Sequence, residues 1–181
     1  AVQGNVNIDL KWDPALAQKN FDEHRRLTDA SDAVALVIWP ESAVEFMVPE
    51  DLAVLPSELM PSFKSSQTYF IFGAKSFRGT LGRAGAKAFN TAFFTDAKGR
   101  VLGRYHKQVL LAFGEYLPFA KILSLIPGIP FADGFTPGPG PIAFHLSRGV
   151  RIAPLICYED LMPDISRKFV SETRANILVN L

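Results

Sequence analysis

Segments rich in apolar residues, many of them β-branched or aromatic, recur along this chain and are separated by short polar turns. Such segments predict strands that are covered on both faces. They lie at residues 34–39, 69–74, 89–94 and 150–156. The third segment is followed by the turn sequence Asp-Ala-Lys-Gly at 96–99, so residues 100–105 are predicted to form the return strand of a hairpin.

Two segments between these strands predict helices. Residues 13–30 begin with Asp-Pro, an N-cap followed by a proline in the first turn. Their apolar side is expected to contain Leu16, Phe21 and Leu27. Residues 163–173 also begin with proline, and Ile165, Phe169 and Val170 are expected on one side. Strands that alternate with helices in this way are typical of the α/β class.

The two ends of the chain both have the pattern of strands. Residues 1–3 (Ala-Val-Gln) indicate the start of a strand, and residues 175–181 indicate a buried strand that stops at the last residue. Since a core strand normally continues into a loop that covers it, we expect the chain to be an excised part of a longer protein.

A long irregular stretch, rich in proline and glycine, lies between Glu115 and Pro141. Its many large apolar side chains make simple disorder a poor interpretation. Two alternatives remain open from the residues alone. The stretch either folds back onto the core or forms an exposed apolar patch for lipid or a protein partner.

Composition narrows the classes of function. The 181 residues carry 19 basic and 18 acidic side chains, a net charge of +1, so the basic excess typical of nucleic-acid-binding proteins is absent. The most apolar charge-free run, residues 122–132, is about half the length that spans a membrane, so we expect neither a spanning helix nor a signal peptide within these residues. Cys157 is the only cysteine, which excludes an intrachain disulfide.

Candidate chemistry gathers where predicted strands end. Glu41 follows the strand at 34–39, Lys107 follows the return strand, and Cys157 lies between a strand and a helix. Open α/β sheets keep their sites at such ends, and a strand-to-helix turn exposes a nucleophile beside backbone N–H groups. A carboxylate can act as base for a thiol, and a lysine can neutralise an oxyanion, so the three residues together suffice for acyl transfer.

Each of these residues also has a simpler interpretation. Glu41 could be a solvated residue after a strand, Lys107 a surface lysine and Cys157 small core filler. The three histidines have no metal-ligand spacing, so no metal site is predicted. His106 adjoins Lys107, and neighbours in an extended segment point to opposite sides, which weakens a Cys-His pair.

The motifs around these residues resemble the nitrilase, or carbon–nitrogen hydrolase, superfamily over almost the whole chain. Within it the chain is most similar to the bacterial apolipoprotein N-acyltransferase branch. The most specific motifs are Phe-Gly-Glu-Tyr-Leu-Pro at 113–118 and Cys-Tyr-Glu at 157–159. Further matching segments are residues 2–6, 11–12, 39–42, 105–107 and 135–138.

The resemblance implies an αββα sandwich in which residues 1–181 form one truncated domain. The membrane-spanning N-terminal region and the C-terminal remainder of that branch would lie outside the chain. The whole protein would be in the bacterial inner membrane, with this domain on the periplasmic side. The exposed edges left by truncation are expected to favour self-association.

The resemblance also implies an activity and residue roles. An acyl chain would pass from a phospholipid to Cys157 and then to the α-amino group of an apolipoprotein's diacylglyceryl-cysteine, with no cofactor. Glu41 would be the general base, and Lys107 with the backbone N–H of Tyr158 would stabilise the oxyanion. Glu115, Trp12, Tyr158 and Glu159 match residues that support the site or on which the activity depends.

For an enzyme with a lipid substrate, the apolar stretch is expected to cover the site and contact lipid. The residues expected to face lipid are Leu117, Phe119, Ile122, Leu125, Ile126 and Phe131. Two alternatives remain: a soluble amidase or carbamoylase with the same three residues, and a non-catalytic domain that binds lipid or a partner and buries Cys157.

Overall fold

The computed structural model describes residues 1–6, 15–83, 85–118 and 134–181. Its helices are α1 (Ala17–Asp29) and α3 (Pro163–Thr173), with short 3-10 helices at Ser57–Leu59, Ser147–Gly149 and Cys157–Leu161. Its strands are β1 (Leu36–Ile38), β2 (Val44–Pro49), β3 (Tyr69–Arg78), β4 (Lys87–Asp96), β5 (Val101–His106), β6 (Phe144–His145), β7 (Arg151–Leu155) and β8 (Ile177–Asn180).

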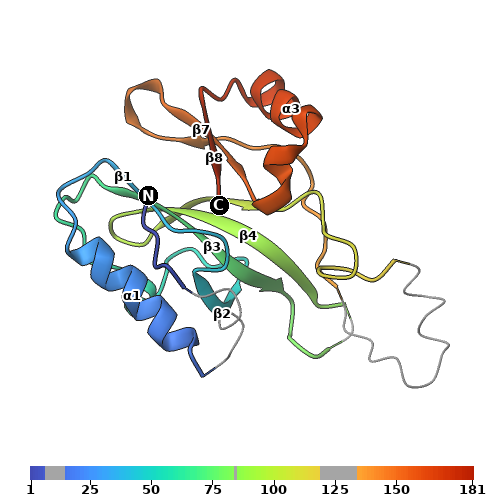
Figure 1. Ribbon diagram of the computed structural model, residues 1–181, viewed down its shortest axis with the longest axis horizontal. Coiled ribbons are helices and arrows are strands. Elements are labelled where there is room, and N and C mark those ends of the chain that lie inside the picture. The colour runs from blue at the N-terminus through green and yellow to red at the C-terminus, as the bar shows by residue number, and fades with distance from the viewer. Residues whose placement is uncertain (7–14, 84, 119–133) are drawn as a thin grey trace.

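The elements form four layers (Figure 1). The first sheet has the order β1-β3-β4-β5, with β2 paired to β3 as well, and the second has the order β6-β7-β8. Helix α1 lies on the outer side of the first sheet, and α3 lies on the outer side of the second. The predicted αββα sandwich is therefore confirmed.

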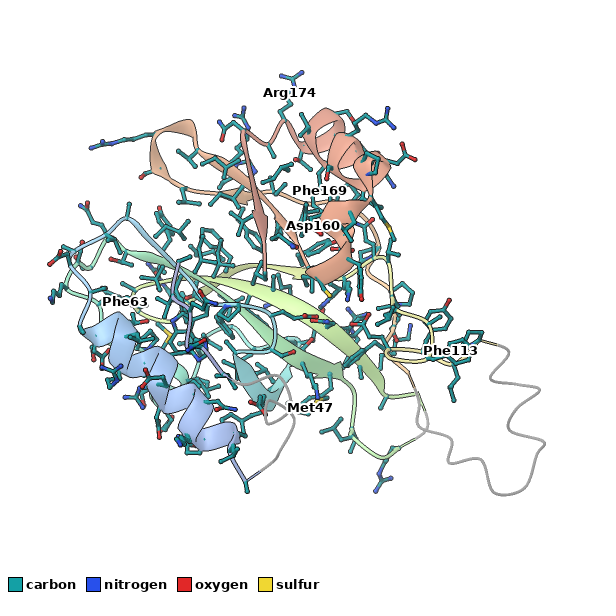
Figure 2. The ribbon with its side chains drawn as sticks, viewed as in Figure 1. Met47, Phe63, Phe113, Asp160, Phe169 and Arg174 are labelled. Carbon is teal, nitrogen blue, oxygen red and sulfur yellow. The ribbon has the colours of Figure 1, made fainter. Side chains whose placement is uncertain are left out.

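The layers are held by two apolar clusters on opposite faces of the first sheet. Strands β3 and β4 are buried along most of their length, because side chains on both of their faces are covered. The cluster on the α1 side contains Phe21, Trp39, Phe70, Phe72 and Phe93. The cluster between the sheets contains Ile71, Phe94, Tyr105, Phe144 and Phe169, the last reaching in from α3 (Figure 2).

Several predicted elements are confirmed. Strands β3 and β4 pair antiparallel from Tyr69 opposite Asp96 to Arg78 opposite Lys87, so both are longer than predicted. The hairpin between β4 and β5 turns at Gly99, which has the positive φ of 77° that glycine adopts readily. Helix α3 has the predicted bounds, while the predicted start of α1 at 13–14 lies outside the described residues.

Other expectations about the first sheet are wrong. Residues 1–3 form no strand, although the Val2 N–H donates a 2.8 Å hydrogen bond to the Ile38 carbonyl. Val34 and Ala35 are exposed, because β1 pairs with β3 only from Leu36 onward. The strand β2 was not predicted at all.

The buried side of α1 also differs from the expected one. It contains Ala17, Phe21, His24 and Thr28, whereas Leu16 and Leu27 are only partly buried. Thr28 is buried because its hydroxyl accepts a 2.8 Å hydrogen bond from the Trp39 indole N–H and donates to the His24 carbonyl. This polar contact ties α1 to the segment that precedes Glu41.

The last strand is not buried as predicted. Ile177 and Leu178 are 44% and 45% exposed, because β8 pairs only with β7 and is an edge strand within the part of the chain described. Val170 also faces solvent, since α3 turns only Ile165 and Phe169 toward the second sheet. Across the described ranges, no helix is long and apolar enough to cross a membrane.

Candidate active site

An interruption at the edge of the first sheet places Glu41. Strands β1 and β2 pair one after the other with the same edge of β3, and residues 39–43 form the break between them. Gly73 on β3 lies opposite this break and donates its N–H to the Pro40 carbonyl at 3.3 Å. A Cβ at Gly73 would lie 2.6 Å from the Glu41 Cα, so only glycine lets the backbone of Glu41 approach the strand.

Lys107 is fully buried beside two carboxylates. It follows β5 directly, and its N–H donates to the Asn90 carbonyl at 2.9 Å, which extends the pairing with β4 by one residue. Its Nζ lies 2.9 Å from Glu115 Oε2 and 3.8 Å from Glu41 Oε1, and the side chain is 1% exposed. The surface-lysine interpretation is therefore wrong.

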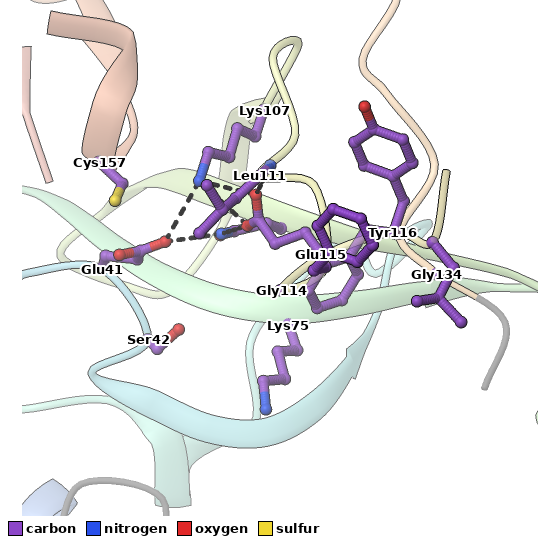
Figure 3. Close-up of a pocket in the computed structure, with 14 residues that line it drawn as sticks. Glu41, Ser42, Lys75, Lys107, Leu111, Gly114, Glu115, Tyr116, Gly134 and Cys157 are labelled. Carbon is purple, nitrogen blue, oxygen red and sulfur yellow. Dashed lines mark hydrogen bonds and ion pairs between the residues drawn. The ribbon is translucent and has the colours of Figure 1, made fainter. Parts of the chain in front are cut away.

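Asn90 joins the same cluster and was not predicted from the sequence. Its Nδ2 donates to Glu41 Oε1 at 2.7 Å and to Glu115 Oε1 at 2.8 Å (Figure 3). A usable signal existed, since Asn90 and Thr91 are polar residues inside a segment that was predicted to be buried on both faces. A buried amide needs partners, so its position alone pointed to a polar cluster.

Cys157 lies at a strained turn between β7 and the 3-10 helix that it begins. Its φ of 56° is unusual for a residue other than glycine, and such strain is typical of nucleophile turns. The N–H of Cys157 donates to the Leu181 carbonyl, and its own carbonyl accepts from Asn180, so the end of β8 fixes the turn. The thiol is half-buried, lines the cavity and points toward Glu41 (Figure 3), which excludes simple core filler.

The surroundings of this thiol favour its protonated form. Burial raises the pKa of Cys157 above its ordinary value, and the negative charge of Glu41 raises it further. The ammonium of Lys107 and the backbone N–H of Tyr158 act in the opposite direction but do not outweigh these effects. A thiol in this state needs a base to become a nucleophile at neutral pH.

Glu159 connects the segment after β5 to the segment before Cys157. Its completely buried carboxylate accepts hydrogen bonds from the N–H groups of Gln108, Val109 and Ile156 and from the Tyr105 hydroxyl. Burial and the carboxylate of Glu159 raise the pKa of Tyr105 far above its ordinary value, so its hydroxyl stays a donor. The carboxylate therefore fixes Lys107 and Cys157 relative to each other.

A cavity of about 720 Å³ opens beside these groups. Its polar lining consists of Glu41, Ser42, Lys75, Asn90, Lys107, Glu115 and Cys157. The rest is largely apolar and comes from the turn after Lys107 and from the segment around Phe135, with Leu111, Phe113, Tyr116 and Leu117 among its side chains. Phe113 is 78% exposed and lies on the outside of this turn (Figure 2).

The remaining residues that the sequence analysis assigned to the site, or considered for it, do not all lie beside the cavity. Tyr158 is 47% exposed and does not line the cavity, although its backbone N–H faces the thiol. His106 is turned away and contacts Thr91 and Glu50. Trp12, Phe119, Ile122, Leu125, Ile126 and Phe131 lie outside the described residues, so their predicted roles stay predictions. In the four described ranges, no group of three or more His, Cys, Asp or Glu side chains could hold a metal ion.

The fold and this cluster define a class of protein. A cysteine at a strand-to-helix turn, facing a carboxylate and a buried lysine between two packed sheets, brings together the types of group that nucleophilic catalysis uses. Residues 1–181 match the family model described as carbon-nitrogen hydrolase, and the chain belongs to this enzyme family.

Within the family, the curated relatives point to one type of enzyme. The chain is 32% identical to the apolipoprotein N-acyltransferase of Geobacter metallireducens and 31% identical to that of Pseudomonas paraeruginosa, over 99% of its length in both cases. It spans about a third of the length of these relatives, 34% and 35% respectively.

Solved structures share the fold at lower sequence identity. An amidase from Nesterenkonia sp. superposes with a TM-score of 0.54 at 19% identity, over 91% of this chain and 58% of the amidase. A glutamine-dependent NAD+ synthetase from Acinetobacter baumannii superposes with a TM-score of 0.51 at 18% identity, over 97% and 29%.

Proposed function

We propose that this chain is the catalytic domain of an apolipoprotein N-acyltransferase. It transfers a fatty acyl chain from a phospholipid to Cys157 and from there to the N-terminal amine of a diacylglyceryl-cysteine lipoprotein. The observation that carries the proposal is the convergence of Glu41, Lys107 and Cys157 on one cavity whose remaining lining is mostly apolar.

In the first half-reaction Glu41 removes the proton from the Cys157 thiol as Sγ attacks the ester carbonyl carbon. Negative charge then develops on the carbonyl oxygen, where the Lys107 ammonium and the Tyr158 N–H stabilise it. The tetrahedral intermediate breaks its bond to the glycerol oxygen, and Glu41 returns the proton to that oxygen. A lysophospholipid leaves, and the acyl chain remains on Cys157 as a thioester.

In the second half-reaction the α-amine of the lipoprotein attacks the thioester carbonyl. Glu41 accepts a proton from the amine, the carbon–sulfur bond breaks, and the proton returns to the Cys157 thiolate. The products are an amide on the lipoprotein and free Cys157. Because one site serves both substrates in turn, the scheme is ping-pong.

The raised pKa of Cys157 is consistent with this order of events. A preformed thiolate would react with many electrophiles, whereas a thiol whose pKa is raised waits for a base and an aligned ester. The apolar side chains at Leu111, Phe113 and Leu117 give an acyl chain a surface beside the polar cluster. A small polar amide needs no such surface.

The length of the relatives supports a wider proposal about the whole protein. Since the chain spans about a third of them, we infer that it is the nitrilase-like domain of a longer enzyme of the bacterial inner membrane. The domain is placed on the periplasmic side, and its partners are a phospholipid donor and an apolipoprotein acceptor. Membrane-spanning helices outside this chain and the apolar stretch that includes Leu117 would hold it at the bilayer.

A transfer assay tests the proposal in the natural protein at full length. That protein is incubated with a phospholipid labelled in its acyl chain and a peptide that begins with diacylglyceryl-cysteine. We expect the label to appear on the peptide amine, and we expect Cys157→Ala to reduce the transfer to background. The same preparation is also incubated with short-chain amides, and their hydrolysis is measured.

Two results would contradict the proposal. Hydrolysis of the short amide without transfer to the peptide would indicate a soluble-type amidase. Absence of both reactions, with a Cys157 thiol that also resists alkylation, would indicate a non-catalytic binding domain.

A further inference from the structure

Asn90 makes two short hydrogen bonds that the catalytic scheme above does not use. It projects from β4, is 4% exposed, and its Nδ2 lies 2.7 Å from Glu41 and 2.8 Å from Glu115. The orientation of the amide is fixed by chemistry, because a flipped amide would point its oxygen at two carboxylate oxygens.

This arrangement leaves the other end of the amide without a partner. The Oδ1 atom of Asn90 is buried and accepts no hydrogen bond within the described residues. A buried acceptor without a partner is unfavourable, so the side chain reduces the stability of the fold at that atom. The presence of asparagine at this position must therefore depend on the two hydrogen bonds that Nδ2 donates.

The charges around Asn90 favour a neutral side chain that donates two hydrogen bonds. Glu41 and Glu115 place two negative charges next to the ammonium of Lys107, and Lys75, which lies opposite Asn90 on β3, adds a second cation to the lining of the cavity. A primary amide donates two hydrogen bonds, one to each carboxylate, without adding charge. An arginine or lysine in its place would also hold the carboxylates but would make Glu41 a weaker base, and a hydroxyl could donate to only one of them.

The backbone of Asn90 reaches the third member of the cluster. Its carbonyl accepts the N–H of Lys107 at 2.9 Å. One residue of β4 thus contacts Glu41 and Glu115 through its side chain and Lys107 through its main chain.

We propose that Asn90 is a positioning residue of this site, whose amide holds Glu41 and Glu115 against Lys107 while leaving Glu41 able to accept a proton. The inference rests on the proposed function, because it assigns Glu41 the role of base. It adds a group that acts through Glu41 and does not touch the reacting atoms.

Asn90→Ala and Asn90→Asp test this in the full-length protein. The rate of Cys157 acylation by phospholipid is measured in a single turnover between pH 6 and 9. We expect Asn90→Ala to be about 10- to 100-fold slower than the wild type across this range, because two charge-assisted bonds are lost. Thr95→Val is the matched control, since Thr95 is buried on the same strand and its hydroxyl has no partner in the described part of the chain.

Asn90→Asp separates positioning from a merely structural role. At high pH the introduced carboxylate repels Glu41 and Glu115, and the rate should fall below that of Asn90→Ala. At low pH it takes up a proton and can donate to one of them. The ratio of its rate to the wild-type rate should therefore rise as the pH falls from 9 to 6, while the ratio for Asn90→Ala stays flat.

Alkylation of Cys157 by iodoacetamide gives a readout that does not depend on phospholipid. If Asn90 holds Glu41 beside the thiol, Asn90→Ala should shift the pH profile of alkylation to lower pH, toward the profile of Glu41→Gln. The proposal is overturned if Asn90→Ala acylates within threefold of the wild type, if the Asn90→Asp ratio does not change with pH, or if the alkylation profile does not move. A wild type that alkylates but never acylates would instead contradict the proposed function, and the alkylation profile would still decide the role of Asn90.

Discussion

Replacing Glu41 by Gln is expected to slow acylation of Cys157 by phospholipid about 10²- to 10⁴-fold while making the thiol more acidic. The rate falls because a general base contributes roughly this factor and glutamine cannot accept the proton. The pKa of Cys157 falls because the negative charge of Glu41 is one of the effects that raise it. In this one variant, the rate of acylation should fall, whereas the rate of thiol alkylation at a given pH should rise.

The ionisation of the thiol is measured as the rate of its alkylation by iodoacetamide between pH 7 and 10. Acylation is measured by intact-protein mass spectrometry. In the wild type the raised pKa means that alkylation should keep increasing with pH beyond the ordinary range of a cysteine. In Glu41→Gln this increase should begin at lower pH. Glu45→Gln is the matched control, because Glu45 lies on β2, bonds to Asn20 and does not line the cavity. Unchanged acylation in Glu41→Gln would remove Glu41 from the role of base.

Replacing Glu159 by Ala is expected to cause the largest loss of stability among single substitutions at this site, about 3–5 kcal/mol. The change leaves the N–H groups of Gln108, Val109 and Ile156 and the Tyr105 hydroxyl without their acceptor in a buried environment. Each unsatisfied donor costs about 1–3 kcal/mol, and four donors at the low end of this range, which applies where water enters the space left by the side chain, give about 4 kcal/mol. Denaturant unfolding of the full-length protein measures the change in the free energy of unfolding.

Asp160→Ala is the control for this change, since Asp160 is the exposed neighbour in the same 3-10 helix. We expect it to alter the free energy of unfolding by less than about 0.5 kcal/mol. Glu159→Gln keeps the size of the side chain and one acceptor oxygen, so its loss should be intermediate. A Glu159→Ala variant as stable as Asp160→Ala would show that other groups replace the lost acceptor and that Glu159 does not hold the two segments together.

The sequence predicted that Glu41, Lys107 and Cys157 lie at strand ends because each follows an apolar segment, and the structure places all three around one cavity. The apolar segment before Glu41, the hairpin before Lys107 and the strand before Cys157 are local patterns, and strand ends are where α/β sheets expose side chains. The two-sided burial of the central parts of β3 and β4 was also predictable, because the segments 69–74 and 89–94 are mostly apolar. The helix at 163–173 was predictable from its N-terminal proline and from the spacing of its apolar residues.

The polar residues within the segment 89–94 indicated a buried polar cluster, but the partners in that cluster were not predictable because they depend on register. Asn90 faces Glu41 and Glu115 only because β4 and β5 align Thr91 with His106 and continue to Lys107. A shift by one residue would turn Asn90 to the opposite face of the sheet. Glu159 was matched by resemblance, but its four partners are supplied by β5, the loop after it and Ile156, which the sequence does not place together.

The exposure of β8 was missed for a related reason. Ile177 and Leu178 have the composition of a core strand, and composition does not say whether a neighbouring layer is present on each side. The same limit applies to α3. The spacing of its apolar residues predicted Val170 and Phe169 on one buried side, but only Phe169 packs inward. Burial depends on the partner surfaces, which the local pattern does not contain.

The central claim is that Cys157 carries the acyl chain as a thioester. The most direct measurement is the intact mass of the full-length wild-type protein after incubation with a dipalmitoyl phospholipid, followed by treatment with neutral hydroxylamine. The account predicts a mass increase of one palmitoyl group that maps to Cys157, disappears with hydroxylamine and is absent from Cys157→Ala. A wild-type protein whose Cys157 alkylates readily but gains no palmitoyl group, or an adduct that persists in Cys157→Ala, would contradict it.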